Sequence, residues 1–136
     1  MITIAAQRTA DKHGAGYFRA PRGNRKHNGI DYACYPNSMI FAPIEGMITK
    51  VGYPYADDLR FRYLEIKNED SLYCRVFYVE PIIGRGTRVT TKSILGTSQK
   101  LGDRYKDITE HCHIEFFTLV DGERNYIDPE DILTHD

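Results

Sequence analysis

Cysteine is scarce in this chain, which has three among its 136 residues. Cys34, Cys74 and Cys112 form an odd set and lack the short spacing of a cysteine-ligated zinc site. The sequence therefore predicts neither a disulfide framework nor a cysteine-based metal centre. This usage is typical of a chain made in a reducing compartment.

Long apolar runs are also missing. No stretch approaches the roughly 20 residues that a transmembrane helix needs. The first residues, MITIAAQRT, lack both the basic and the apolar region of a secretory signal. We therefore expect a chain made in the host cytoplasm without a signal peptide and with no membrane partner.

Charge of one sign is not in excess. Eighteen Lys and Arg residues face 19 Asp and Glu residues, which gives a net charge of −1. This balance offers no electrostatic reason to expect a nucleic-acid partner. One basic cluster is present, at Arg19, Arg22, Arg25 and Lys26. It either contacts an anionic substrate or forms a solvated loop, and the sequence favours the loop.

The chain is rich in short β-type segments separated by turn residues. Its length predicts a single domain over residues 1–136. The expected strands are 2–6, 39–43, 46–53, 62–67, 71–81, 87–91, 93–98 and 111–119. We interpret Gly86 and Gly96 as tight corners between antiparallel strands. Only residues 128–133 have a helical pattern, with Asp128 as N-cap and Pro129 at the first position. The pattern indicates an all-β, sandwich-like or barrel-like fold.

Two segments carry the functional signal, and the first is HNGID, which contains His27 and Asp31. Asn28-Gly29 is a turn signal, so the pair is expected where a loop enters a strand. The two side chains either share a metal ion or form a local hydrogen bond within the turn.

The second segment is HCHIEFFTL, whose apolar and β-branched residues predict a strand. Alternate residues of a strand share a face. His111, His113 and Glu115 would then face one way, while Cys112 and Ile114 face a core. The polar face is either part of a metal site or a solvated surface. The same alternation directs Cys112 away from the histidines, which argues against it as a ligand.

Together the two segments offer what a hydrolytic zinc site requires. Catalytic zinc takes three protein ligands from His, Asp or Glu and keeps its fourth position for water. A further group nearby can then move protons for that water. Because 86 residues separate His27 from His113, only a folded domain can bring them together.

As an ordered set, these motifs resemble the lysostaphin-type zinc metallopeptidases, which cut peptide bonds in peptidoglycan. The pattern H-x-G-x-D, then A-P-x-x-G, appears as His27, Gly29, Asp31, Ala42, Pro43 and Gly46. The later pattern appears as Gly86, Val89, Ile94, Gly96, His111, His113 and Glu115. The resemblance covers about residues 11–133. DKHGAGYF, RVFYVEP and QKLGDRYKDITEHCHIE resemble the branch that contains leukocyte cell-derived chemotaxin and phage-encoded peptidases.

The resemblance implies a compact antiparallel β domain with a substrate groove and one zinc ion on its floor. It implies that His27, Asp31 and His113 are the zinc ligands and that His111 handles the proton of the bound water. Glu115 is expected to orient a histidine by a hydrogen bond. Outside these motifs, His13 would either line the groove or be structural, and His135 would be solvated.

One residue departs from the pattern of the active family members. They carry a second catalytic histidine in a Tyr-x-His strand, and Tyr78 occupies that place here. The chemotaxin also has a tyrosine there and is regarded as lacking peptidase activity. A tyrosine hydroxyl can still donate a hydrogen bond to a developing oxyanion. We therefore expect Tyr78 and His111 to be the catalytic residues.

These expectations define a function and its alternatives. The first is a zinc-dependent peptidoglycan endopeptidase that hydrolyses stem or cross-bridge peptides. We expect it to be phage-encoded and to act at the cell wall or periplasm as an endolysin, or on the virion beside phage tail proteins. The alternative is an inactive zinc-containing binding or structural module, such as a tail component. A signalling ligand like the chemotaxin is disfavoured because no signal peptide is visible.

Overall fold

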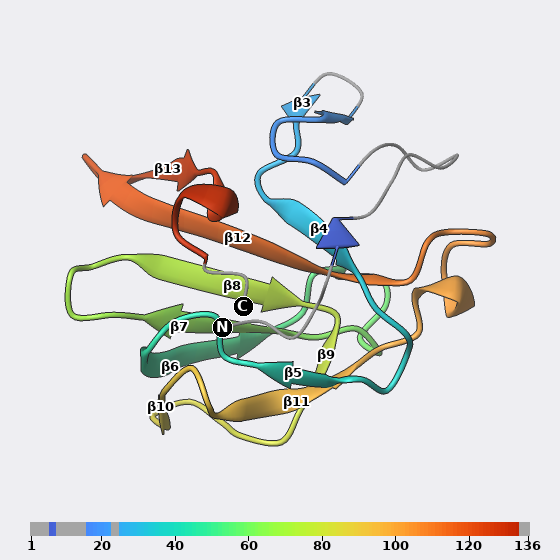
Figure 1. Ribbon diagram of the computed structural model, residues 1–136, viewed down its shortest axis with the longest axis horizontal. Coiled ribbons are helices and arrows are strands. Elements are labelled where there is room, and N and C mark those ends of the chain that lie inside the picture. Colours follow the sequence, from blue (N-terminus) through green and yellow to red (C-terminus); the bar gives the residue numbers. More distant parts are fainter. Residues whose placement is uncertain (1–5, 8–15, 23–24, 134–136) are drawn as a thin grey trace.

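The structure, a computed structural model, describes residues 6–7, 16–22 and 25–133. Antiparallel strands dominate it (Figure 1). The strands are β1 Ala6–Gln7, β2 Pro21–Arg22, β3 Arg25–Lys26, β4 Ile30–Ala33, β5 Met39–Phe41, β6 Gly46–Gly52, β7 Tyr63–Lys67, β8 Tyr73–Phe77, β9 Val79–Pro81, β10 Arg88–Val89, β11 Ile94–Ser98, β12 His111–Val120 and β13 Glu123–Ile127. Two single 3-10 turns, η1 Leu101–Asp103 and η2 Pro129–Asp131, complete the described elements.

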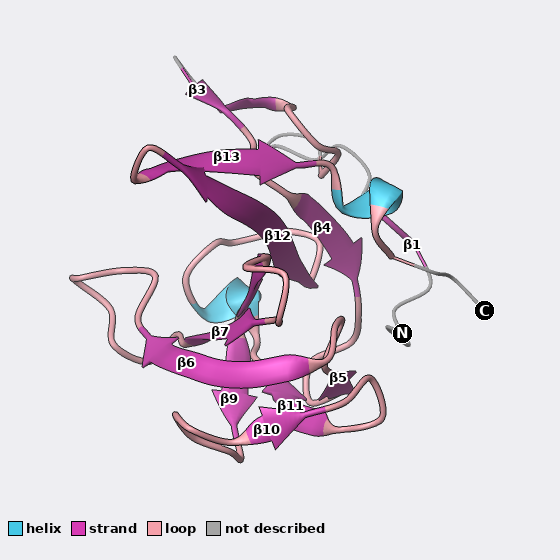
Figure 2. Ribbon diagram, turned by 90° about the vertical axis from the view of Figure 1, so that its left-hand side faces the viewer, coloured by secondary structure: helices cyan, strands magenta, loops and turns pink. Residues whose placement is uncertain are grey.

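The strands form one large sheet, one small sheet and a hairpin. The large sheet has the order β1-β4-β12-β8-β7-β6-β10, and β13 pairs with the free part of β12. The small sheet has the order β5-β11-β9, and β2 pairs with β3. Figure 2 shows the small sheet gathered below β6, at the opposite end of the molecule from β13 and β3. The predicted all-β antiparallel fold is confirmed.

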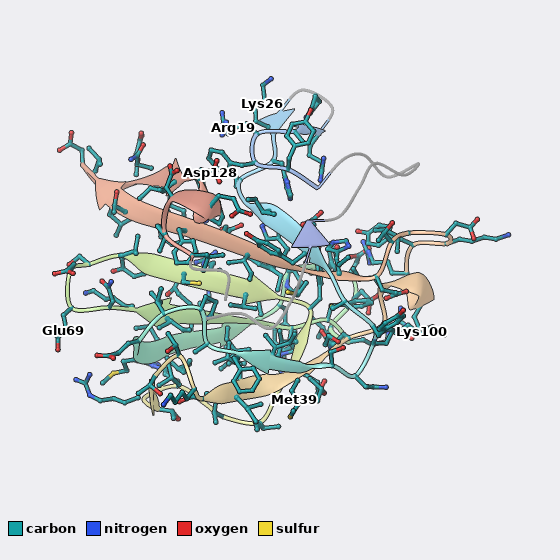
Figure 3. All side chains as sticks on the ribbon, viewed as in Figure 1. Arg19, Lys26, Met39, Glu69, Lys100 and Asp128 are labelled. Atoms are coloured by element: carbon teal, nitrogen blue, oxygen red, sulfur yellow. The ribbon has the colours of Figure 1, made fainter. Side chains whose placement is uncertain are left out.

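The core lies between the apolar face of the large sheet and the small sheet. Strand β12 contributes the fully buried Cys112, Ile114 and Phe116, in keeping with the predicted alternation. These side chains belong to one apolar cluster that also contains Ile40 of β5 and Leu95 of β11. Polar and exposed side chains such as Met39, Glu69 and Lys100 point outward around this core (Figure 3). The opposite face of β12 is therefore left for polar chemistry.

Several predicted boundaries differ from the structure. The strand expected over 71–81 is broken at Tyr78, whose φ of 73° separates β8 from β9. Gly96 lies within β11, at a register shift, rather than at a corner between strands. A glycine is required there because an added Cβ would clash with the backbone carbonyl oxygen of Glu80. Gly86 does lie in a turn, with a φ of 91°.

The helical prediction was correct in place but incomplete. Residues 129–131 form the 3-10 turn η2, and the backbone N–H of Glu130 donates to the Asp128 carboxylate, as an N-cap requires. A second 3-10 turn, η1, was not predicted. Strands β2, β3 and β13 were also missed, because their sequences are short or polar. No helix in the described part of the chain is long and apolar enough to cross a membrane.

Candidate metal centre and groove

The polar face of the large sheet carries its side chains in rows set by strand register. One row crosses four strands and contains Tyr63, Phe77, His113 and Asp31. The next row contains Glu65, Arg75 and Glu115. Because paired residues on neighbouring strands lie about 5 Å apart, Asp31 of β4 stands directly beside His113 of β12. Register alone therefore brings two of the three expected ligands together.

His27 reaches the same place from the loop that precedes β4. The His27 backbone N–H donates to the Ala20 carbonyl at 2.8 Å. The His27 carbonyl accepts from the Arg19 N–H, also at 2.8 Å. Gly29 lets this loop lie directly on β12, because a Cβ there would come within 2.1 Å of the Ile114 carbonyl oxygen. The H-x-G-x-D spacing is thus a packing requirement: His27 can approach His113 only across a glycine.

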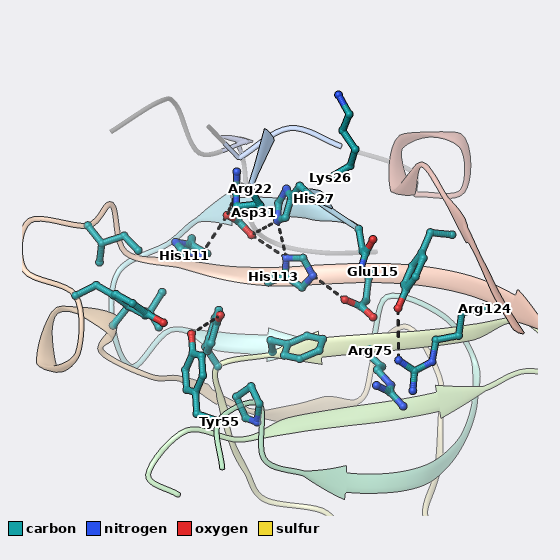
Figure 4. Close-up of a pocket in the computed structure, with 18 residues that line it drawn as sticks. Arg22, Lys26, His27, Asp31, Tyr55, Arg75, His111, His113, Glu115 and Arg124 are labelled. Atoms are coloured by element: carbon teal, nitrogen blue, oxygen red, sulfur yellow. Dashed lines mark hydrogen bonds and ion pairs between the residues drawn. The ribbon is translucent and has the colours of Figure 1, made fainter. Parts of the chain in front are cut away.

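Three ligand-type atoms converge at this point (Figure 4). His27 Nε2 lies 3.1 Å from Asp31 Oδ1 and 3.0 Å from His113 Nδ1. His113 Nδ1 lies 2.9 Å from the same carboxylate oxygen. Among the described residues, these three side chains form the group whose ligand atoms lie close enough together to hold a metal ion. Ligands of tetrahedral zinc are separated by about 3.3 Å when the bonds are roughly 2.0–2.1 Å, so the triangle is close to the size that zinc needs.

The outer nitrogen of each imidazole has an acceptor of its own. His27 Nδ1 lies 2.9 Å from the Tyr17 carbonyl oxygen, and His113 Nε2 lies 2.9 Å from Glu115 Oε1. Each outer nitrogen therefore donates, which turns the lone pair of the other nitrogen toward Asp31. Two lone pairs and a carboxylate facing one another need a cation between them, so the donor set fits a zinc ion. The hydrogen bond expected from Glu115 to a histidine is present.

The charges of the metal-free triad follow from these contacts. Burial lowers the pKa of His113, but its hydrogen bonds to Asp31 and Glu115 outweigh burial and raise that pKa from 6.5 to about 9. Burial would raise the pKa of the Asp31 carboxyl, yet its contacts with the His113 and His27 imidazoles hold that pKa well below its usual value. Without metal, a proton on His113 therefore balances the Asp31 carboxylate.

His111 lies beside the triad without joining it. Its Nδ1 donates to the Thr109 carbonyl oxygen at 2.7 Å, which leaves the Nε2 lone pair facing the site. Nε2 lies 3.4 Å from Asp31 Oδ2, the carboxylate oxygen that does not contact the other two histidines. The side chain is 4% exposed, so its orientation is fixed. An imidazole nitrogen at this place, beside the metal position, can accept a proton from a water there.

Tyr78 approaches His111 from the opposite wall. The two rings meet edge to face with their centroids 5.6 Å apart, and the Tyr78 hydroxyl lies 2.9 Å from that of Tyr55. Tyr105 meets Tyr55 edge to face at 6.1 Å. The positive φ of Tyr78 directs its ring toward this cluster, while its N–H donates to the Arg62 carbonyl at 2.8 Å. The structure thus places the Tyr78 ring beside His111.

All five candidate residues line one groove with a volume of about 560 Å³. Figure 4 shows Tyr55 on one side of His113 and a pair of arginines, Arg75 and Arg124, on the other. Arg22, from the basic cluster that was expected to form a solvated loop, also lines the groove. Its guanidinium lies 3.5 Å from Asp31 Oδ2. The view of the basic cluster as simply a solvated loop was therefore wrong for Arg22. His13 and His135 lie outside the described residues.

Several residues that line the groove were not predicted from the sequence, among them Tyr55, Arg75 and Arg124. Tyr55 stands in a loop without a motif, and nothing in its neighbourhood indicates a partner for Tyr78. Arg75 belongs to the strand predicted over 71–81. Its spacing of two residues from Phe77 was the available signal that both side chains lie on the same face of that strand. Arg124 lies in the unpredicted strand β13, so its position could not be inferred.

No profile of a known protein family matches the chain. Among curated proteins, it is 32% identical to leukocyte cell-derived chemotaxin-2 of Bos taurus over 115 residues. The alignment covers 84% of this chain and 75% of that protein. The chain belongs to the leukocyte cell-derived chemotaxin-2 family.

Solved structures extend the likeness in fold. A zinc-containing peptidase of Vibrio cholerae is 19% identical, with a TM-score of 0.62 over 92% of this chain. Lysostaphin of Staphylococcus simulans is 17% identical, with a TM-score of 0.65 over 90% of this chain. This chain spans 39% of the first structure's chain and 50% of the second. The member of the chemotaxin family described here thus has the fold of these peptidases, as the sequence motifs implied.

Proposed function

We propose that this protein is a zinc-dependent peptidoglycan endopeptidase that binds one zinc ion per chain through His27, Asp31 and His113. The observation that carries the proposal is the convergence of two imidazole lone pairs and a carboxylate oxygen within 3.1 Å of one another. Each ligand is held by a partner that fixes its orientation. The peptidase fold and the groove of about 560 Å³ beside the three ligands support the same function.

The residues of the groove would divide the work of peptide hydrolysis. Zinc bound here supplies a polarised scissile carbonyl and a water that loses its proton near neutral pH. His111 Nε2 accepts that proton and returns it to the leaving amine, first as base and then as acid. The Tyr78 hydroxyl donates a hydrogen bond to the carbonyl oxygen as that oxygen gains negative charge. Tyr55 can donate to Tyr78 at the same time, because their oxygens lie 2.9 Å apart.

Within this function we propose a phage-encoded lysis enzyme or virion component as the setting. The substrates would be stem or cross-bridge peptides of the cell wall, and phage tail proteins would be partners of a virion form. The support is the resemblance of the sequence motifs to phage-encoded peptidases.

The second candidate is a zinc-containing module that binds the wall or a tail protein without cutting. The observation that favours it is Tyr78, since an unperturbed tyrosine pKa of about 10 makes it a poor base near neutral pH. The 32% identity to a chemotaxin favours it as well. Both candidates require the metal and differ only in turnover.

One experiment separates the two candidates. Purified protein, loaded with one equivalent of zinc, is incubated with peptidoglycan sacculi, and the released muropeptides are identified by mass spectrometry. The endopeptidase releases peptides with new amino termini, and a chelator abolishes their release. Stoichiometric zinc together with product no greater than the blank would establish the non-catalytic module instead.

A further inference from the structure

The end of the groove beyond Glu115 carries two arginines that the proposed chemistry does not use. Arg75 lies on β8, opposite Glu115 in register, and Arg124 reaches the same place from β13. Both line the groove with the zinc ligands. Figure 4 shows the two guanidinium groups next to each other, on the side of His113 that faces away from Tyr55.

The two guanidinium groups share one aromatic ring. The Arg75 guanidinium carbon lies 5.4 Å from the centroid of Phe117, and that of Arg124 lies 5.1 Å from it. Arg124 is also 3.5 Å from the Tyr126 hydroxyl, across from Phe117 in the β12–β13 register. The ring and the hydroxyl hold Arg124 in place, although the residue is exposed. Two like charges on one ring repel each other unless anions lie beside them.

Only one of these two cations has an acid at contact distance. Arg75 Nε donates to Glu65 Oε1 at 2.8 Å, and both side chains are 11% exposed. Glu115 is turned toward His113, to which its Oε1 is bonded. Within the described ranges, no carboxylate oxygen lies within 4.0 Å of a nitrogen of Arg124. Arg124 is thus a pre-positioned cation with room for an external anion.

The net charge of the residues that line the groove is also positive. Its ionised groups are the cations Arg22, Lys26, Arg75 and Arg124 and the carboxylates Asp31 and Glu115. A bound zinc ion would add two further positive charges. A neutral peptide leaves this positive charge in place, whereas a carboxylate placed at Arg124 offsets part of it and can accept two parallel N–H bonds from the guanidinium.

We propose that Arg124, supported by Arg75, binds a free carboxylate of the substrate, so that the substrate class is an acidic peptide rather than a neutral glycine bridge. This proposal rests on the proposed function, since it assigns a subsite of the same groove. Arg75 lies one residue pair, or roughly 7 Å, beyond the His113 row along β12, and the Phe117 ring that holds the Arg124 guanidinium lies two residue pairs, or roughly 14 Å, beyond that row. The carboxylate would therefore belong to a residue a few positions away from the scissile bond and not to the bond itself.

The test compares a cross-linked muropeptide dimer bearing its free carboxylates with the same dimer after carbodiimide coupling to ammonia. The second form replaces each carboxylate with a carboxamide of nearly the same shape. Binding of both forms to the zinc-loaded protein is measured by calorimetry in the His111→Ala background, so that turnover does not consume the ligand. We expect the carboxylate form to bind about tenfold more tightly, as one hydrogen-bonded ion pair would provide.

Variants at Arg124 locate the preference. Arg124→Gln should reduce the tenfold ratio to about one, and Arg124→Lys should retain part of it because the charge remains. Arg88→Gln, which removes an exposed cation of β10 outside the groove, should leave the ratio intact. Equal binding of the two dimers by the unmodified groove would overturn the inference. So would an Arg124→Gln variant that weakens both dimers equally, or an absence of binding by either.

The outcome for the proposed function is read separately. Protein with wild-type His111 that shows the carboxylate preference but releases no peptide from sacculi would contradict the endopeptidase and leave the carboxylate subsite standing. Hydrolysis that is equally fast on the carboxylate and carboxamide dimers would support the endopeptidase and contradict the carboxylate subsite.

Discussion

The groove has a ligand half and a tyrosine half, and they are built differently. The ligand half comprises His27, Asp31 and His113 with their outer partners. It depends on paired strands, since Asp31 and His113 are register neighbours on β4 and β12. The tyrosine half comprises Tyr55, Tyr78 and Tyr105. It depends on loops and on a positive φ at Tyr78, where β8 ends.

The difference separates metal binding from turnover. Both histidine ligands of the first half have a hydrogen-bond partner on their outer nitrogen, and Asp31 Oδ2 lies 3.5 Å from the Arg22 guanidinium, so the geometry exists before the metal arrives. The second half has no carboxylate and gains its order from hydroxyl and ring contacts. We infer that the two halves respond independently to substitution. The ligand half governs zinc content, and the tyrosine half affects rate alone.

The largest effect is expected at His113. His113→Ala removes the ligand at the centre of the triad, so zinc content should fall from about one per chain to near zero, and hydrolysis should fall to the blank. Elemental analysis after gel filtration checks the metal, and muropeptide release checks the rate. His111→Ala, a change of the same size two residues away, is the matched control. Full zinc occupancy in a His27→Ala/His113→Ala double variant would refute the ligand set.

The second effect tests the boundary between the halves. His111→Ala should keep the zinc and the fold but lose roughly a hundredfold to ten-thousandfold in rate, the usual range for a general base or acid. Circular dichroism and elemental analysis establish the fold and metal, and the rate is measured with saturating substrate. Equal zinc loss in the His111 and His113 variants would show that the roles within this strand are wrongly divided.

The third effect lies wholly in the tyrosine half. Tyr78→Phe should keep zinc and slow hydrolysis by about a hundredfold to a thousandfold, as the loss of one oxyanion donor does. Tyr35→Phe, at a tyrosine that is 87% exposed, is the control for the substitution itself. If wild type and Tyr78→Phe hydrolyse sacculi at the same rate, Tyr78 is not a donor. If wild type itself is inactive, Tyr78→His tests whether a second histidine restores turnover.

The same comparison explains how far the sequence could predict the site. His111, His113 and Glu115 could be placed on one face because strand alternation is rigid, and the structure has them there. The meeting of His27 with His113 could not follow from alternation. It depends on Gly29 lying against the Ile114 carbonyl, a tertiary contact for which the only signal was the resemblance of H-x-G-x-D to a known motif.

The tyrosine half shows where local patterns fail. The run SLYCRVFYVEP alternates through position 78, so it predicted one continuous strand. In the structure, the Tyr78 N–H bonds to Arg62 and its carbonyl accepts from Gln99, and these tertiary hydrogen bonds stabilise a backbone conformation that tyrosine rarely adopts. Tyr55 and Arg124 reach the groove from a loop and from a polar strand, neither of which carries a periodic signal.

The fourth effect concerns the outer partner of a ligand. Glu115→Gln keeps the size of the side chain but removes its charge, so His113 loses part of its basicity and its fixed orientation. Zinc affinity should fall by about tenfold to a hundredfold, the range found for such outer partners. Competition with a metal-binding dye measures the affinity. Glu123→Gln, at an exposed position of β13, is the matched control. Unchanged affinity in Glu115→Gln would mean that the Glu115 bond is structural only.

The effect that is smallest for a single step, one pH unit, is the pH dependence of the ligand half, and its sign is distinctive. The pKa of His113 is raised to about 9 in the metal-free fold, above its unfolded value near 6.5. Its contribution to stability is therefore complete below pH 6.5 and is lost as pH rises toward 9. Zinc requires the neutral imidazole, so zinc affinity should instead rise, by about tenfold per pH unit, over the same window. Calorimetry at pH 7 in buffers of different ionisation enthalpy should show about one proton released per zinc. Thermal melts of protein from which a chelator has removed the zinc should show a melting temperature that falls as pH rises over this window. Zinc affinity that is flat between pH 6.5 and 9 would mean that no proton occupies the metal position.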